Sequence, residues 1–376
     1  RPPRSTLFPY TTLFRSFYLL IKIKKIISKN NYSFNYYNNY TTNIFSSYKL
    51  DKFVKYINIS KQGTLLFKNN LVKSNYPDVS VIISLYNRDS YINSTIVSVQ
   101  NQRMKNIEII IVDDYSTDNS IKYVEQAQQH DPRISLIKNG KNMGALYSKS
   151  IGVLHSKGKY ILSLDSDDMI CIDNYIEVLY KIIKKRNYDY IESNKYIEVN
   201  LYNRTINQKR ISKMLLWVKL IKKNIYEEII NRIGKNALNK GITTLDDNFI
   251  LLFLKDNQNF KEINKIGVFH YKHFTNQIYA SNFNKERILT FCRNIIKAID
   301  VLFDISDDNI DSKKYCYYRL NLYLIKSECF NVTNLKNNIT MIFKKFLNSH
   351  LINNNSKKYI MKALKKMHVK KQLLYL

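Results

Sequence analysis

Short apolar runs alternate with helical patterns between residues 79 and 164. The runs are four to six residues long and rich in β-branched residues, which predicts buried strands at Val79–Ile83, Ile107–Val112, Ile134–Ile137 and Tyr160–Leu164. Between them, apolar residues recur every three to four positions, as in amphipathic helices. Strands that alternate with single helices form parallel sheets with right-handed crossovers. The pattern therefore predicts an α/β fold, with a Rossmann-like, mostly parallel sheet flanked by helices.

The connecting segments predict three helices in this block. We expect the first to be capped by Asp89 or Ser90, the second by Thr117, and the third to end at Gly158. The buried faces of the first two helices are predicted to be formed by Ile92, Ile96, Val99, Ile121, Val124 and Ala127.

The rest of the chain divides by composition into further segments. Residues 1–16 resemble the translation of a sequencing adapter and are left out of the fold prediction, so we expect the true N-terminus to be missing. Residues 17–76 are rich in Asn, Tyr and Lys, which predicts a partly disordered lead-in to a domain of residues 77–275. Residues 211–252 have a mixed, mainly helical pattern, and residues 276–376 predict a helical C-terminal region.

The charge of the chain is strongly positive. Lys and Arg number 60 against 30 Asp and Glu, a formal net charge of +30. Because the excess is spread along a chain rich in residues with A/T-rich codons, genome composition explains it better than a polyanionic partner, and no specific nucleic-acid binding is expected. The basic C-terminal segment from residue 357 is read as a solvated helix face, with peripheral membrane contact as the alternative. We expect a cytoplasmic or membrane-peripheral protein, and the oligomeric state is left open.

Polar and acidic residues follow three of the predicted strands. Ser84 and Tyr86 follow the first, Asp114 the second, and the segment Asp165-Ser166-Asp167-Asp168 the fourth. Ligands bind at the carboxyl ends of strands in open α/β sheets, so these clusters predict one site. Adjacent carboxylates repel one another unless a cation lies nearby, and oxygen ligands suit Mg²⁺ or Mn²⁺. The alternative for the acidic segment is a cap for the helix expected from Asp173.

Four stretches carry a resemblance to a known family. They are "VSVIISLYNRDSYINSTIVSVQNQ", "IEIIIVDDYSTDNSI", "KNMGALYSKSIGVLHSKGKYILSLDSDD" and "LDDNFILLFL". In order and spacing they resemble family 2 glycosyltransferases of the GT-A fold, from Asp78 to about His273. The resemblance implies an inverting, metal-dependent enzyme that moves a sugar from a nucleotide-sugar, most simply a UDP-sugar, to a glycan, lipid or protein acceptor. The Gln-x-x-Arg-Trp motif of processive members is absent, because Leu216 precedes Trp217, so transfer of a single sugar is expected.

The resemblance also implies roles for the strand-end residues. Asp165 faces the ribose and the metal, Asp167 ligates the metal directly, and Asp168 is a weaker candidate. Asp114 accepts the uracil N–H, while Asp113 is expected to hold the following turn. Ser84 and Tyr86 line the nucleotide, with ordinary turn or cap hydrogen bonding as their alternative.

Three later positions complete the predicted site. Lys149 stands where many members have Arg, so it either binds the donor or is a surface charge. The resemblance makes Asp247, after Asp246, the catalytic base, with a helix cap as the alternative. His273 is expected to be a metal contact, while a structural role is the alternative for it and for His270. A catalytically inactive GT-A relative that binds a sugar nucleotide or glycan is the alternative function.

Overall fold

The structure is a computed structural model that describes residues 73–200, 205–210, 215–254, 256–257, 259–272 and 285–305 of the 376-residue chain. The predicted lead-in before residue 73 and most of the predicted C-terminal region, including the basic segment from residue 357, lie outside these residues. None of the described helices is long and apolar enough to cross a membrane.

All four predicted strands are confirmed. They are β1 (Val79–Leu85), β2 (Ile107–Asp113), β3 (Ile134–Lys138) and β4 (Tyr160–Asp165). They pair in parallel in the order β3-β2-β1-β4. β1, β2 and most of β4 are buried because helices cover both faces of the sheet, which explains their continuous apolar sequences, whereas β3 is only partly buried.

Beyond β4 the sheet is mixed. The order continues through β8 (Lys219–Lys222), β6 (Tyr190–Asn200), β9 (Phe260–Lys272) and β5 (Met169–Ile170), and β7 (Thr205–Arg210) pairs with β6. Only the β6–β9 pair is parallel in this half. The helical and mixed pattern predicted for residues 211–252 is confirmed by two helices between residues 223 and 254, but the prediction did not identify β8 as a strand. The first residue of β8, Lys219, is buried in an ion pair with Glu192, and such a charged position hides a strand in the hydrophobic pattern.

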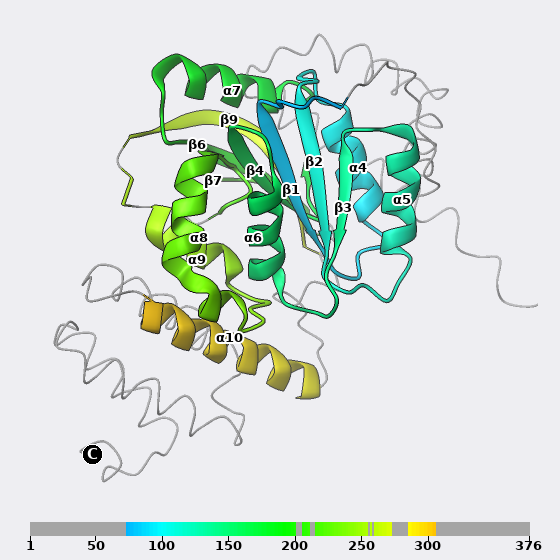
Figure 1. Ribbon diagram of the computed structural model, residues 1–376, viewed down its shortest axis with the longest axis vertical. Coiled ribbons are helices and arrows are strands. Elements are labelled where there is room, and N and C mark those ends of the chain that lie inside the picture. Colours follow the sequence, from blue (N-terminus) through cyan, green and yellow to red (C-terminus); the bar gives the residue numbers. More distant parts are fainter. Residues whose placement is uncertain are drawn as a thin grey trace, which may run out of the picture.

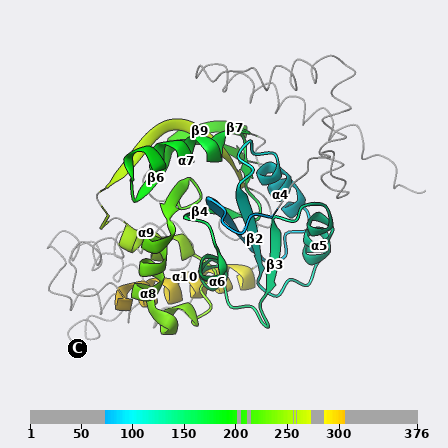
Figure 2. The ribbon, with the colours of Figure 1, turned by 45° about the horizontal axis from the view of Figure 1, so that its top comes forward.

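Helices cover both faces of the sheet (Figures 1 and 2). One face packs against α4 (Ile92–Gln100), α5 (Ser120–His130) and α7 (Tyr175–Arg186). The other packs against α6 (Ala145–His155) and α8 (Lys223–Leu238). α9 (Asp246–Leu254) packs on both of these helices, and α10 (Lys285–Ile305) packs on α8. α6 lies very close to β1, because a Cβ at Gly152 would be 2.4 Å from the Ile82 side chain.

The predicted helix faces are confirmed apart from Ile121, which is only half-buried, but the predicted caps are wrong. α4 begins at Ile92 and α5 at Ser120, and neither has a side-chain cap. The polar side chains before them join the two loops instead: Asp118 accepts the Asp89 N–H, and the Thr117 hydroxyl lies 3.4 Å from Asn87 Oδ1.

Candidate active site

The carboxyl ends of β1, β2 and β4 meet at one edge of the sheet. Strand register sets Leu85 opposite Asp113, and Ser84 opposite Asp165. The three polar clusters that follow these strands therefore lie together, as the sequence predicted.

Lys149 joins residues from three distant elements. Its Nζ on α6 lies 3.0 Å from Asp165 Oδ1 at the end of β4. The same atom is 2.7 Å from Asp246 Oδ2 and 2.7 Å from Asp247 Oδ1, both in the first turn of α9. Lys149 is only 3% exposed, so the surface-charge alternative is wrong. The structure thus brings the predicted donor carboxylate and the predicted base to one ammonium group.

The charges of this cluster perturb one another. Burial lowers the pKa of Lys149, but the three carboxylates outweigh this effect and hold the pKa well above its usual range. Burial raises the pKa of Asp247 to about 6, against the opposing effect of Lys149. A carboxyl group of that pKa is a carboxylate at neutral pH and is still basic enough to accept a proton.

The start of α9 fixes the direction of Asp247. Asp246 and Asp247 lie in its first turn rather than at its cap, where their charge complements the helix dipole. Asp247 Oδ2 also accepts the Leu216 N–H at 3.3 Å. The alternative role of Asp247 as a helix cap is therefore right that the residue lies at the start of a helix. It is incomplete, because Asp246 and Asp247 both also pair with Lys149.

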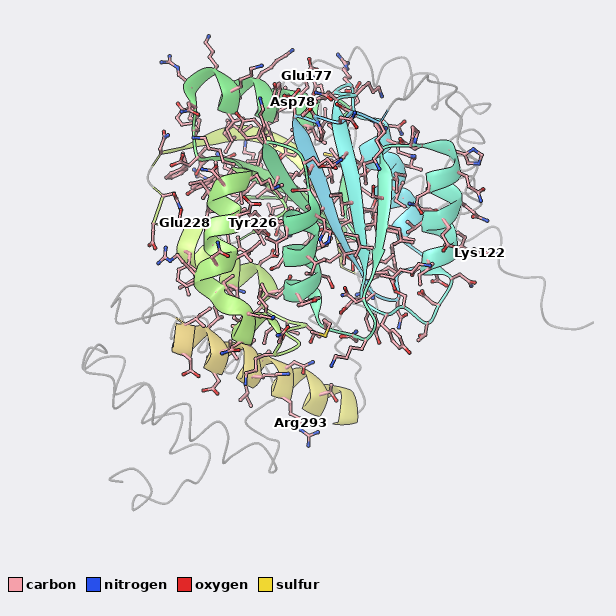
Figure 3. All side chains as sticks on the ribbon, in the orientation of Figure 1. Asp78, Lys122, Glu177, Tyr226, Glu228 and Arg293 are labelled. Carbon is pink, nitrogen blue, oxygen red and sulfur yellow. The ribbon has the colours of Figure 1, made fainter. Side chains whose placement is uncertain are left out.

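Tyr226 on α8, which is labelled in Figure 3, is fully buried. Its hydroxyl lies 3.3 Å from Ser163 Oγ on β4, which fixes α8 to the strand that ends in Asp165.

Each carboxylate of the acidic segment pairs with a different cation. Asp165 contacts Lys149, and Asp167 Oδ2 lies 3.0 Å from Arg88 Nε. Asp168 Oδ1 lies 3.1 Å from His270 Nδ1 on β9. Protein cations therefore relieve the repulsion that the sequence argument assigned to a metal. α7 begins only at Tyr175, after Asn174, so the segment does not cap that helix.

The pair formed by Asp168 and His270 is strongly perturbed. Burial raises the pKa of Asp168 to about 7, against the effect of His270. Burial lowers the pKa of His270, but Asp168 outweighs it and raises the value to about 9. The His270 ring also stacks on Trp217, with centroids 5.3 Å apart. His270 thus has a structural environment beside the site, whereas His273 lies outside the described residues.

Asp114 is bonded to the loop before α6. Its Oδ1 accepts the Met143 N–H at 2.7 Å and an Asn139 Nδ2 hydrogen at 2.9 Å, and its Oδ2 accepts the Gly144 N–H at 2.8 Å. Asp113 accepts the Ser116 N–H at 3.1 Å, which confirms its expected role in the turn. The binding of uracil by Asp114 stays a prediction.

Ser84 and Tyr86 keep their side chains available. Ser84 is half-buried between Val112 and Asp165, and Tyr86 is exposed. Neither side chain makes a hydrogen bond to the residues that the structure describes, so turn or cap bonding does not account for them.

Gly144 connects the loop that is bonded to Asp114 with the segment that precedes Asp247. Its φ is +89°, and a Cβ there would lie 2.4 Å from Ile242 O. The Leu146 N–H donates to the same oxygen at 3.3 Å. Only glycine fits this close contact.

The sequence prediction missed Arg88 as a partner of Asp167. The sequence could have indicated this role, because Arg88 lies only three residues after β1, within the first stretch that resembles the family. In the described part of the chain, no group of three or more His, Cys, Asp or Glu side chains is arranged to hold a metal.

Comparison with known proteins identifies the domain that contains most of this site. The family model described as Glycosyl transferase family 2 matches residues 80–244. The chain contains a family 2 glycosyltransferase domain. The match ends two residues before Asp246, so the family 2 domain match itself does not reach the predicted base.

Curated relatives share only part of their length with this chain. An uncharacterized glycosyltransferase of Haemophilus influenzae is 38% identical over 114 residues, which are 30% of this chain and 35% of the relative. Glycosyltransferase GlyG of Streptococcus pneumoniae serotype 4 is 35% identical over 118 residues, 31% of this chain and 39% of GlyG. The chain thus spans well under half the length of these relatives.

Solved structures confirm the GT-A-type architecture of the family 2 domain. S. aureus TarS 1-349 in complex with UDP-GlcNAc has a TM-score of 0.54 at 14% identity, covering 79% of this chain and 90% of that one. The complex of the same protein with UDP has a TM-score of 0.52 at 15% identity, covering 79% and 88%. At this identity the similarity concerns the fold.

Proposed function

We propose that this protein is an inverting, metal-dependent glycosyltransferase that moves a single sugar from a UDP-sugar to the hydroxyl of a glycan, lipid or protein acceptor. The observation that carries the proposal is the common contact of Asp165, Asp246 and Asp247 with Lys149. This contact supports the proposal because the residues proposed as the donor-side carboxylate and the base share one buried cation, at the edge of the sheet where ligands of this fold class bind.

The donor end is formed by the β1, β2 and β4 strand ends. Ser84, Tyr86 and Asp114 face the nucleoside, and Asp165 faces its ribose. The UDP and UDP-GlcNAc complexes of TarS, which has a similar fold, support a uridine nucleotide.

Asp165 and Asp167 fit a divalent cation that is completed by substrate. They offer carboxylate oxygens two residues apart in one turn, and Mg²⁺ or Mn²⁺ commonly takes only one or two carboxylates together with water and substrate phosphate. Such an ion neutralises charge on a diphosphate leaving group. Arg88, which is paired with Asp167, would supply a second positive charge to a diphosphate bound beside that carboxylate.

The transfer needs one base. Asp247 takes the proton of the acceptor hydroxyl as its oxygen forms a bond to the anomeric carbon. The bond from that carbon to the diphosphate oxygen breaks on the opposite face, and its electron pair leaves with UDP, so the configuration inverts. Lys149 keeps Asp247 ionised and directed. A catalytically inactive relative that binds a sugar nucleotide or glycan stays the alternative function, and measured turnover distinguishes the two.

Donor binding is tested by calorimetric titration of UDP, with and without Mn²⁺. We expect metal-dependent binding by the unchanged protein and loss of that dependence in Asp167→Ala, because the ion loses its direct ligand. Asp256→Asn, which removes a carboxylate from an exposed pair with Arg232, is the matched control and should bind normally. Failure of the folded, unchanged protein to bind UDP under either condition would contradict the proposal.

The rate of transfer is expected to fall as pH drops through about 6. Burial raises the pKa of Asp247 to about 6, and only the ionised form can accept a proton, so turnover is retained above this value and lost below it. The measurement is kcat against pH from 5 to 8. A rate that stays flat through this range would argue against Asp247 as the base.

A further inference from the structure

Two tyrosines are exposed at neighbouring strand ends. Tyr86 directly follows β1 and is 40% exposed, and Tyr115, two residues after β2, is 55% exposed. The register of Leu85 with Asp113 puts both at the same edge of the sheet. Within the described part of the chain, the structure gives neither ring an aromatic partner and neither hydroxyl a hydrogen bond. Both side chains are therefore available to a ligand.

Tyr115 has an unfavourable backbone conformation. Its φ is +70°, in the left-handed region that bulky residues avoid. The other non-glycine residues with positive φ in the described chain are Asn87, Asn187 and Leu245. Asparagine adopts this conformation readily, and Leu245 is 5% exposed, so its side chain contributes to the core. Tyr115 combines the strain with an exposed ring, and packing within the described fold does not account for it.

The neighbours of Tyr115 hold it in this conformation. On one side, the Asp114 N–H donates to Leu85 O at 2.8 Å, and the Asp114 carboxylate binds the loop before α6. On the other, the Ser116 N–H donates to Asp113, and Ser116 Oγ accepts the Asn87 N–H at 3.0 Å. The backbone is fixed on both sides while the ring stays in solvent. Strain that is held in this way is typical of functional sites.

We infer that Tyr115 stacks on the nucleobase of the donor, beside Tyr86, which the proposed function already assigns to the nucleoside. The inference rests on the proposed function, because the edge that displays both rings is the one assigned to the nucleotide. A flat π-system is the ligand that two exposed tyrosines at adjacent strand ends fit best. Stacking strengthens binding without reading which base is present, because every base has a π-face. The choice of uracil is then left to hydrogen-bonding groups such as Asp114.

The test compares Tyr115→Gly with Tyr115→Phe by calorimetry of UDP and of pyrophosphate, beside thermal unfolding. Tyr115→Gly should weaken UDP binding by about tenfold or more, because a stacked ring is lost. Pyrophosphate has no base, so its affinity should not change. Glycine also relieves the left-handed strain, so Tm should rise by about 2 °C. Tyr115→Phe keeps the ring and should match the unchanged protein, as should Tyr76→Ala, which alters an exposed tyrosine before β1.

The outcomes separate this inference from the proposed function. If the unchanged protein binds UDP and Tyr115→Gly binds it equally well, the inference is overturned and the proposed function stands. Equal weakening of UDP and pyrophosphate, or a lower Tm in Tyr115→Gly, would assign Tyr115 a structural role and overturn the inference as well. If the unchanged protein binds no UDP, the proposed function fails first and the inference falls with it.

Discussion

Replacing Lys149 with methionine is expected to lower the free energy of unfolding by about 3–5 kcal/mol at neutral pH. Methionine fills nearly the same volume, so the loss comes from charge. Asp165, Asp246 and Asp247 would keep their negative charges without the buried ammonium that they share. Urea denaturation of the unchanged protein and of Lys149→Met measures the difference.

The dependence of this loss on pH identifies its cause. The pKa of Asp247 is already raised by burial to about 6, and losing Lys149 raises it further. A carboxyl group whose folded pKa exceeds its unfolded value destabilises the fold at high pH, and the effect fades as pH falls toward the unfolded value near 4. The gap between the two proteins should therefore narrow between pH 7 and pH 5.

Two control variants test whether the loss of stability in Lys149→Met comes from the loss of the buried charge. Lys149→Arg keeps the cation and should be much more stable than Lys149→Met. Lys222→Met removes a lysine from a more accessible pair with Asp189 and should cost no more than about 1 kcal/mol. A loss in Lys149→Met that is as small as in Lys222→Met, or that does not change with pH, would contradict the electrostatic account.

Replacing Asp247 with asparagine is expected to lower kcat by about 10²–10⁴-fold, because the amide has the same shape but cannot accept a proton. UDP affinity should be unchanged, since Asp165 and Asp167 are intact and Lys149 keeps two carboxylate partners. The measurement is the rate of UDP release from UDP-glucose and UDP-N-acetylglucosamine with screened glycan acceptors. Asp256→Asn is again the matched control. An Asp247→Asn protein with normal turnover would move the base to another residue.

The first half of the sheet could be predicted because its signals are local. β1 to β4 are short runs rich in β-branched residues, and one amphipathic helix connects each of these strands to the next along the chain. A pattern of a few neighbouring residues is therefore enough to identify each element. The acidic strand ends followed from the same topology. Residue identities at the site came from the family resemblance, which the family 2 match to residues 80–244 supports.

The second half of the sheet could not be predicted in the same way. β6 and β9 pair with two shifts of register, between Ser193 and Lys195 and between Lys195 and Ile197, which break the alternation that marks a strand. Buried charges such as Lys219 and Glu192 hide the strands further. The role of Lys149 was also out of reach, because Asp247 lies 98 residues away and only the folded chain brings them together.

The close contact between Gly144 and Ile242 constrains any redesign of this protein. One side of the loop before α6 is bonded to Asp114, at the proposed nucleotide end, and the other contacts the backbone that leads into Asp247, the proposed base. The two ends of the proposed site are therefore mechanically linked. If the proposed roles hold, a loop exchange that changes the nucleotide preference would also displace Asp247, so donor choice and turnover would have to be optimised together.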